Sequence, residues 1–246
     1  MKRIDDDVLD VLRTVRCEGA HARLEGQLER GLYVKVNKVL QALGGKWNRT
    51  AKAHVFDGGD PQDLLSDVVT TGQYLDWRQE LQFYETPRPL AEQMCEIAGA
   101  DDETAILEPS AGRGALARVA RDMGASVWCI EVHPKFADDL SSQGFHVTVG
   151  DFLQMTPDAC YNAVVMNPPF RNGQDMGHVR YAFEFLIAGG VLVAVMSAGM
   201  TFRQDRKAVA FRAWLAQRGG TWEELPSGTF KESGTLVNAV LVTVRK

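Results

Sequence analysis

The end of a short apolar segment carries residue types that suit a planar group with an NH2 substituent. Ala163 to Met166 is apolar and partly β-branched, as strands buried in parallel sheets are, and Asn167-Pro168-Pro169-Phe170 follows it. The prolines end the strand, because neither can donate a backbone hydrogen bond. Asn167 offers an amide oxygen, Pro168 a carbonyl oxygen and Phe170 a flat apolar ring. Since ligands bind at the carboxyl ends of strands in open α/β sheets, we expect a binding site here.

This tetrapeptide resembles motif IV of the S-adenosyl-L-methionine-dependent amino-methyltransferases, whose pattern is Asn/Asp-Pro-Pro-aromatic. The resemblance is to class I enzymes, in particular to DNA adenine-N6 methyltransferases of the bacterial and phage type. It implies that Asn167 and the Pro168 carbonyl hold the exocyclic nitrogen of a base while Phe170 stacks on its ring. The implied catalytic residues are Asn167, Pro168, Pro169 and Phe170, and Asn167 also borders the cofactor. The alternative is an ordinary tight turn after a strand.

A glycine-rich turn lies between the apolar segment at 105–107 and an expected helix at 115–123. Gly112 and Gly114 allow the backbone to turn sharply and let a ligand approach the N-terminus of that helix. The turn resembles motif I of class I methyltransferases. The resemblance implies that S-adenosyl-L-methionine binds to Glu108, Pro109, Ser110, Ala111, Gly112 and Gly114.

The same turn also fits a rival function. Gly112-x-Gly114-x-x-Ala117 followed by a later acid is a passable dinucleotide fingerprint, as in a dehydrogenase. Glu108 disfavours this interpretation, because its carboxylate would lie where the pyrophosphate must bind. The same carboxylate suits the cationic amino group of S-adenosyl-L-methionine.

Two further acids follow expected strands. Glu131 ends a strand at 126–130, where a carboxylate accepts hydrogen bonds from the ribose hydroxyls in Rossmann-like sites. Asp151 and Phe152 follow a strand at 147–149. The resemblance implies that Asp151 accepts from the adenine amino group of the cofactor and that Phe152 packs on the adenine ring. Gly150-Asp151 is otherwise a common turn.

Two weaker motifs complete the set. Gln82 to Pro87 resembles motif X, which implies that Tyr84 and Thr86 lie under the methionine end of the cofactor. Thr86 also has the residue type to cap the helix expected at 89–98. Phe230, ahead of Ser-Gly-Thr, resembles motif VIII, whose aromatic ring packs on the second face of the target base. It could instead belong to the core of a hairpin.

The order of these motifs predicts the fold. It implies an α/β, Rossmann-like class I methyltransferase with a seven-stranded sheet and a C-terminal β-hairpin, preceded by a small α+β module. We expect the module at 1–75 and the methyltransferase domain at 76–246. Within the domain we expect a mobile loop at 171–177, a helix at 181–187 and the fifth strand at 191–197.

The N-terminal module is locally basic in an acidic chain. The net charge is −5, yet 30–56 holds six Lys or Arg and no Asp or Glu. Helices are expected at 5–16, 34–43 and 63–69, and a strand or hairpin at 46–56. Lys46 and Arg49 could contact phosphates while Trp47 stacks on a base or sugar. The alternative is a solvated basic face with Trp47 against a helix.

The leading functional prediction is methyl transfer from S-adenosyl-L-methionine to adenine N6 in DNA. The alternatives are an RNA methyltransferase acting on adenine N6 or guanine N2, a protein glutamine methyltransferase, and a catalytically silent protein that binds the cofactor or nucleic acid. Four scattered cysteines predict neither a metal site nor disulfides. No apolar run could span a bilayer and no signal peptide is recognisable, so we expect a cytoplasmic protein.

Overall fold

The computed structural model of this chain describes residues 2–56, 60–74, 84–231, 233, 235 and 237–246. It divides into two units, Met1–Phe83 and Tyr84–Lys246, which are described in turn. The predicted boundary follows residue 75, whereas the structure divides after residue 83. Residues 75–83, which lie between these two positions, are outside the described residues.

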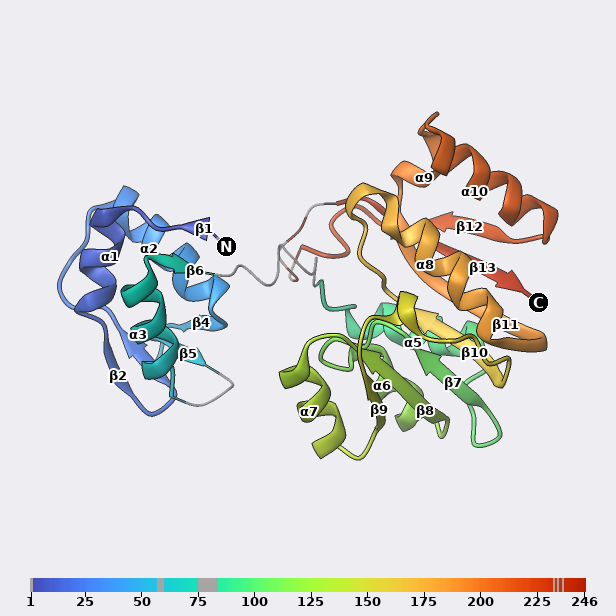
Figure 1. The fold of residues 1–246 in the computed structure, drawn as a ribbon, viewed down its shortest axis with the longest axis horizontal. Coiled ribbons are helices and arrows are strands. Elements are labelled where there is room, and N and C mark those ends of the chain that lie inside the picture. Colours follow the sequence, from blue (N-terminus) through green and yellow to red (C-terminus); the bar gives the residue numbers. More distant parts are fainter. Residues whose placement is uncertain (1, 57–59, 75–83, 232, 234, 236) are drawn as a thin grey trace. The chain divides into compact units, whose positions relative to one another are not determined.

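A seven-stranded sheet organises residues 84–246 (Figure 1). Its strands are β7 (Ala105–Glu108), β8 (Ser126–Glu131), β9 (His146–Val149), β10 (Tyr161–Met166), β11 (Leu186–Ser197), β12 (Thr221–Glu224) and β13 (Ala239–Arg245). The order across the sheet is β12-β13-β11-β10-β7-β8-β9. Neighbouring strands from β11 to β9 are parallel, whereas β13 is antiparallel to both β11 and β12.

This topology confirms the predicted Rossmann-like methyltransferase fold with its C-terminal hairpin. In the dinucleotide-binding arrangement the sixth strand lies beside the fifth. Here β13 lies between the fifth strand, β11, and the sixth, β12. The strand order therefore counts against the dehydrogenase alternative.

Helices cover both faces of the sheet (Figure 1). They are α5 (Arg88–Ala98), α6 (Ala115–Asp122), α7 (Pro134–Ser142), α8 (Gln174–Ala182), α9 (Gly199–Phe202) and α10 (Arg206–Gln217), with short 3-10 helices at Phe152–Gln154, Arg171–Gly173 and Phe183–Phe185. Ala163 and Val165 of β10 pack in the core with α5 and α6, while Val164 and Met166 pack with α8 and α10. Both faces of β10 are buried, which explains its continuous apolar sequence.

The prediction of a mobile loop at 171–177 is wrong. A 3-10 helix occupies Arg171–Gly173 and α8 starts at Gln174, so the helix expected at 181–187 ends at Ala182 and β11 begins at Leu186. Asn172 and Gly173 have φ values of 56° and 69°, which are left-handed conformations that turn the chain into α8. Residue types that suggested a loop therefore form the start of a helix.

The N-terminal unit is an α+β module with its own core, which includes Val8, Leu12, Val36 and Leu40. Its antiparallel sheet has the order β2-β3-β5-β4, and β1 pairs separately with β6. The strands are β1 (Lys2–Arg3), β2 (Arg16–Glu18), β3 (His21–Arg23), β4 (Gly45–Asn48), β5 (Ala53–Phe56) and β6 (Gln73–Tyr74). The helices are α1 (Asp6–Arg13), α2 (Arg30–Ala42) and α3 (Gln62–Thr71).

The module confirms the hairpin expected at 46–56 and the three expected helices, with shifted ends. The β2–β3 hairpin was not expected. In the described ranges, no helix has both the length and the apolar character that crossing a membrane requires. Within the same ranges, no group of three or more His, Cys, Asp or Glu could hold a metal ion.

Candidate active site

Asn167, directly after β10, has its amide nitrogen held by the segment that precedes α5. Its Nδ2 donates to the carbonyl oxygen of Tyr84 at 2.8 Å and to Oγ1 of Thr86 at 3.1 Å. Because a carbonyl oxygen only accepts, these partners assign the orientation of the amide. No donor among the described residues binds Oδ1. Asn167 therefore presents an unused acceptor oxygen at the carboxyl end of the sheet.

The rest of the tetrapeptide adds a second acceptor and a ring. Pro168 is buried, Phe170 is half-buried, and the Phe170 ring packs against the core that contains α5 and α6. The Phe170 carbonyl accepts from the N–H of Gly173 at 3.1 Å. Within the described part of the chain no backbone N–H donates to the Pro168 carbonyl. Two oxygens and a partly exposed ring thus follow one strand.

Thr86 does not cap α5, contrary to the sequence-based expectation. Pro87 precedes the helix in an extended conformation, with φ −58° and ψ 142°, so Thr86 lies one residue too early. Its buried hydroxyl instead accepts from Asn167. No local sequence pattern joins residues so far apart, so the pairing was missed. Gln82 and Phe83, the first residues of the predicted motif, lie outside the described residues.

Glu108 ends β7 as a buried carboxyl group. It is 2% exposed, and burial raises its pKa well above the usual range, although the Ala117 N–H and the charge of Arg118 act in the opposite direction. Its Oε2 has no hydrogen-bond partner. An unpartnered buried carboxyl oxygen fits a cationic group, such as the amino group of S-adenosyl-L-methionine.

Glu131 fastens the glycine-rich turn to the end of β8. Its Oε2 accepts from the Gly112 N–H at 2.6 Å and its Oε1 from the His133 N–H at 2.7 Å. Each oxygen keeps capacity for another donor, so the predicted bonds to ribose hydroxyls stay a prediction. Gly114 is the N-cap residue of α6 with φ 80°, and a Cβ there would lie 2.6 Å from Cδ2 of Leu140. Only glycine fits this position without rearrangement.

The other residues of the glycine-rich turn are largely buried. Pro109 and Ala111 are buried and Ser110 is half-buried. The N–H of Ala111 donates to the carbonyl of Ile130 at 3.1 Å, which adds a second link between the turn and β8. The turn is thus held in place before any ligand binds.

Asp151 and Phe152 lie at the end of β9, but in different surroundings. Asp151 is exposed, and its Oδ1 accepts from the Leu153 N–H at 3.0 Å. Phe152 is 3% exposed, with ring centroids 5.3 Å from Tyr181 and 5.2 Å from Phe185. Its ring is therefore part of the core, and its contact with the cofactor stays a prediction.

Phe230 is 2% exposed and belongs to the core shared with α5 and α6. The structure thus matches the alternative of a core residue in the hairpin connection. A contact between Phe230 and a target base would require its ring to be uncovered, and that role stays a prediction.

Asp175 is a buried carboxyl group that sequence analysis missed. It is 1% exposed on α8, and its Oδ2 accepts from the N–H of Ser197, the last residue of β11, at 3.0 Å. Its Oδ1 has no partner, and burial raises its pKa to about 6. Because the sequence analysis placed residues 171–177 in a loop, it gave no reason to expect this carboxyl group to be buried.

The predicted contact residues of the N-terminal unit are all exposed. Lys46 and Trp47 are in β4, and Arg49 is in the turn that leads to β5. Trp47 is 46% exposed, and its ring meets His54 edge-on at 5.3 Å. Lys35 of the same unit forms ion pairs with Asp5 and Asp7.

Residues 104–217, which span β7 to α10, match the family described as "Methyltransferase small domain". Over this stretch, which is just under half of the chain, the sequence is similar to that family, and its strand order is the one predicted for a class I methyltransferase. The cofactor of such a domain is S-adenosyl-L-methionine. This match agrees with the buried Oε2 of Glu108, which has no hydrogen-bond partner, and with the glycine-rich turn. No curated protein matches the sequence significantly.

Solved structures share the fold of the methyltransferase domain. The 23S rRNA methyltransferase ErmE is 20% identical, with a TM-score of 0.51 over 67% of this chain and 70% of that one. A putative RNA methyltransferase from Pyrococcus horikoshii is 23% identical, with a TM-score of 0.51 over 71% and 90%. A dimethyladenosine transferase from Plasmodium falciparum is 12% identical, with a TM-score of 0.52 over 66% and 63%. At these identities the likeness establishes the fold alone.

Proposed function

We propose that the methyltransferase domain methylates the exocyclic amino nitrogen of a base in nucleic acid, with adenine N6 in DNA as the first candidate. The observation that carries this proposal is the orientation of Asn167. Its NH2 is bound by Tyr84 and Thr86, so Oδ1 and the Pro168 carbonyl are both acceptors without donors in the described residues. An amino group has two N–H donors, one for each oxygen.

These two oxygens address the chemical difficulty of the reaction. The lone pair of an aromatic amino group is conjugated with the ring, so the nitrogen is a poor nucleophile. If each N–H donates to one oxygen, the nitrogen becomes more pyramidal and its lone pair points out of the ring plane. Asn167 and Pro168 thereby favour attack through positioning and electrostatics.

The cofactor supplies an electrophilic methyl group on a sulfonium. With the cofactor bound, a C–N bond would form as the S–C bond breaks, neutral S-adenosyl-L-homocysteine would be the leaving group, and the methylated nitrogen would lose one proton to solvent. No general base is needed before transfer. Within a polymer the target base must leave its stack, and the half-buried Phe170 ring offers a surface on which the extruded base stacks.

RNA is the second candidate substrate. The solved structures with TM-scores of 0.51 are named as a 23S rRNA methyltransferase and a putative RNA methyltransferase. Adenine N6 and guanine N2 are both exocyclic amino groups, so the two acceptors at Asn167 and Pro168 suit either base. The exposed Lys46, Trp47 and Arg49 of the N-terminal unit would contact phosphates and bases of either polymer.

Product analysis separates these candidates. The full-length protein is incubated with methyl-labelled S-adenosyl-L-methionine and, separately, duplex DNA, single-stranded DNA, RNA and a protein mixture, and the nucleic acids are digested to nucleosides. Label in N6-methyldeoxyadenosine supports the first candidate. Label only in RNA nucleosides rejects DNA and supports the second, and label only in protein rejects the proposal.

We expect Asn167→Ala to lower the rate of transfer by about 10²-fold or more, because it removes one of the two acceptors. Binding of S-adenosyl-L-methionine, measured by calorimetry, should change far less. Asn238→Ala, which removes an exposed amide elsewhere in the domain, is the matched control and should leave both quantities unchanged. An equal loss of binding and transfer in the Asn167 variant would contradict the assigned role.

A further inference from the structure

The corner between β11 and α10 presents an aromatic side chain to solvent. This α9–α10 corner, residues 199–207, contains Phe202, whose side chain is 67% exposed. No other large apolar residue in the described ranges is as exposed. A single exposed apolar residue is common on protein surfaces. The features around Phe202 are what give it significance.

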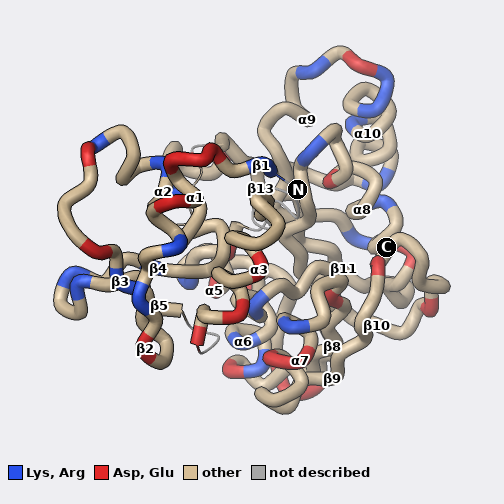
Figure 2. Tube along the Cα trace, turned by 60° about the vertical axis from the view of Figure 1, so that its left-hand side comes forward, with Lys and Arg blue, Asp and Glu red and all other residues tan. Residues whose placement is uncertain are grey.

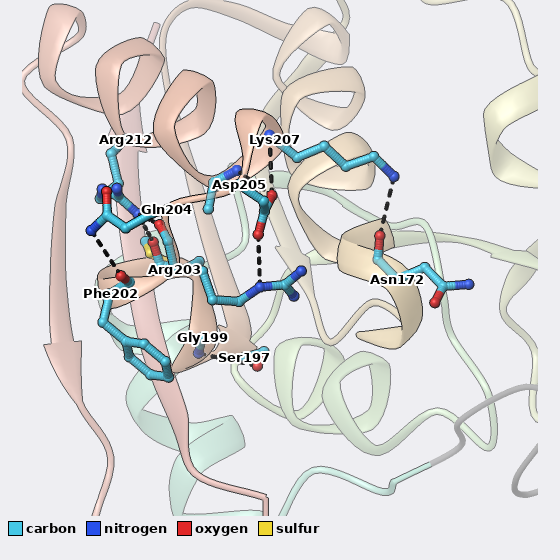
Figure 3. A network of polar contacts seen from close by, with 11 residues as sticks. Asn172, Ser197, Gly199, Phe202, Arg203, Gln204, Asp205, Lys207 and Arg212 are labelled. Atoms are coloured by element: carbon cyan, nitrogen blue, oxygen red, sulfur yellow. Dashed lines mark hydrogen bonds and ion pairs between the residues drawn. The ribbon is translucent and has the colours of Figure 1, made fainter.

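Polar contacts hold the corner in one conformation (Figure 3). Arg212 reaches back from α10 and donates to the carbonyls of Met200 and Arg203, both at 2.8 Å. Asp205 caps α10 by accepting from the N–H groups of Lys207 and Ala208, each at 3.1 Å. The backbone is therefore fixed on both sides of Phe202, and its exposure is not the fraying of a chain end.

The corner and α10 are also strongly basic. Residues 199–218 contain five Lys or Arg and one Asp in a chain of net charge −5. Figure 2 shows Lys and Arg along the turn before α10 and along the helix itself. Arg203, Arg206 and Lys207 immediately follow Phe202 and are exposed. An aromatic ring beside several cations is the combination that binds stacked bases and their phosphates.

The corner is connected to the segment that directly follows the Asn167–Phe170 tetrapeptide. Lys207 Nζ donates to the carbonyl of Asn172, two residues beyond Phe170, at 3.2 Å (Figure 3). β11 lies beside β10 with Ala194 opposite Met166, so the corner and Asn167 follow neighbouring strands at the same edge of the sheet. The basic α9–α10 corner therefore lies close to the segment that carries Asn167 and Phe170.

A groove between α8 and α10 extends this surface. It encloses about 470 Å³, and Arg180, Arg206 and Lys207 line it together with apolar residues that include Met176 and Phe211. Three cations around an apolar floor suit a chain of flat bases joined by phosphates. Arg206 and Lys207 belong to both the corner and the groove, so the two surfaces adjoin.

We propose that the α9–α10 corner binds the nucleic acid next to the target base, with Phe202 stacked on an adjacent base and Arg206 at a phosphate, while Arg203 keeps its 2.8 Å ion pair with Asp205. When the target base leaves its stack, its neighbours lose a stacking partner, and Phe202 replaces it. This inference rests on the proposed function, because it takes the substrate to be a nucleic acid.

The test measures binding separately from catalysis. Full-length Phe202→Ala is titrated with fluorescein-labelled single-stranded and duplex oligonucleotides, and KM and kcat are determined on the nucleic acid that the unaltered protein methylates. We expect Kd and KM to rise about tenfold, with the affinity for S-adenosyl-L-methionine unchanged. Phe202→Trp should restore binding, whereas a role of Phe202 in folding alone would not make binding depend on an aromatic ring.

Trp222→Ala is the matched control. Trp222 is 43% exposed on β12, but two glutamates follow it instead of cations, so its removal should leave Kd and KM unchanged. Equal effects of the Phe202 and Trp222 variants, or no effect of Phe202→Ala in a protein that methylates nucleic acid, overturn this inference alone. If the unaltered protein neither binds nor methylates nucleic acid, the proposed function fails and this inference with it.

Discussion

At the scale of single residues, the most informative feature is the use that Asn167 makes of its amide. An isolated asparagine at a strand end could present either its oxygen or its nitrogen to a ligand. The Tyr84 carbonyl and the Thr86 hydroxyl bind the nitrogen and thereby decide between them. Thr86, which the sequence related to the cofactor, thus also acts as a positioning residue for Asn167.

We expect Thr86→Val to lower kcat by roughly two- to tenfold, which corresponds to the loss of one hydrogen bond of about 0.5–1.5 kcal/mol. The valine keeps the volume of the buried side chain but removes the acceptor for Nδ2 of Asn167. Steady-state kinetics together with cofactor titration measure the effect, and the affinity for S-adenosyl-L-methionine should change less than kcat. Thr86→Ser keeps the hydroxyl and is the control. Equal rates for the valine and serine variants would remove Thr86 from this role.

At the scale of elements, the strands and their ends were predictable while several connections were not. Strands β7, β8 and β10 are largely buried between two layers of helices, so their sequences are apolar and stop at the motifs. The β2–β3 hairpin escaped because its strands are three residues long and mostly polar. The start of α8 was not predicted because Asn172 and Gly173 are residue types typical of loops. Their left-handed backbone conformation, which leads into the helix, is known only from the structure.

The site residues divide in the same way. The positions of Asn167 and of the glycine-rich turn directly after strands were predictable from the local pattern. The bond from Thr86 to Asn167 and the burial of Asp175 depend on tertiary packing. No periodicity in the sequence records either of them.

Asp175 joins α8 to the end of β11 and makes this junction sensitive to pH. Its pKa is about 6 in the folded protein and 3.8 in an unfolded chain, so between these values the folded state holds a proton that the unfolded state has lost. The contribution of Asp175 to stability therefore falls as pH rises from about 4 to about 6.

We expect Asp175→Asn to stabilise the protein at pH 7 by on the order of 1–3 kcal/mol. The amide keeps an acceptor for the Ser197 N–H but cannot ionise. At pH 4.5 the gain should be much smaller, because the aspartate is then mostly protonated. Urea denaturation at both pH values measures this difference. If the substitution destabilised the protein equally at both pH values, ionisation of Asp175 would not be what limits stability, and the prediction would be wrong.

At the scale of the whole molecule, the distribution of charge matters more than its sum. The chain carries 32 Asp or Glu against 27 Lys or Arg, yet the segments 30–56 and 199–218 are both basic. One lies in the N-terminal unit and the other in the methyltransferase domain. Each segment is therefore a candidate contact surface for a polyanion, although the whole chain is acidic.

We expect Arg49→Ala to weaken nucleic-acid binding and to reduce the slope of log K against log salt concentration by about one, the change that follows loss of one phosphate contact. Fluorescence anisotropy between low and moderate salt concentrations measures this slope. Lys35→Ala is the control, because Lys35 is already paired with Asp5 and Asp7, at 2.8 and 3.4 Å, and should affect the slope less. An unchanged slope for the Arg49 variant would exclude a phosphate contact there.

The position of β13 between β11 and β12 bears on how the protein emerges from the ribosome. Of the seven strands, β13 is translated last, although it fills an interior place in the sheet. At about 5–20 residues per second, the nascent chain spends seconds with the apolar edge of β11 unpaired, while the N-terminal unit has already left the exit tunnel. Chaperones that shield exposed strand edges during synthesis should therefore raise the yield of the native enzyme.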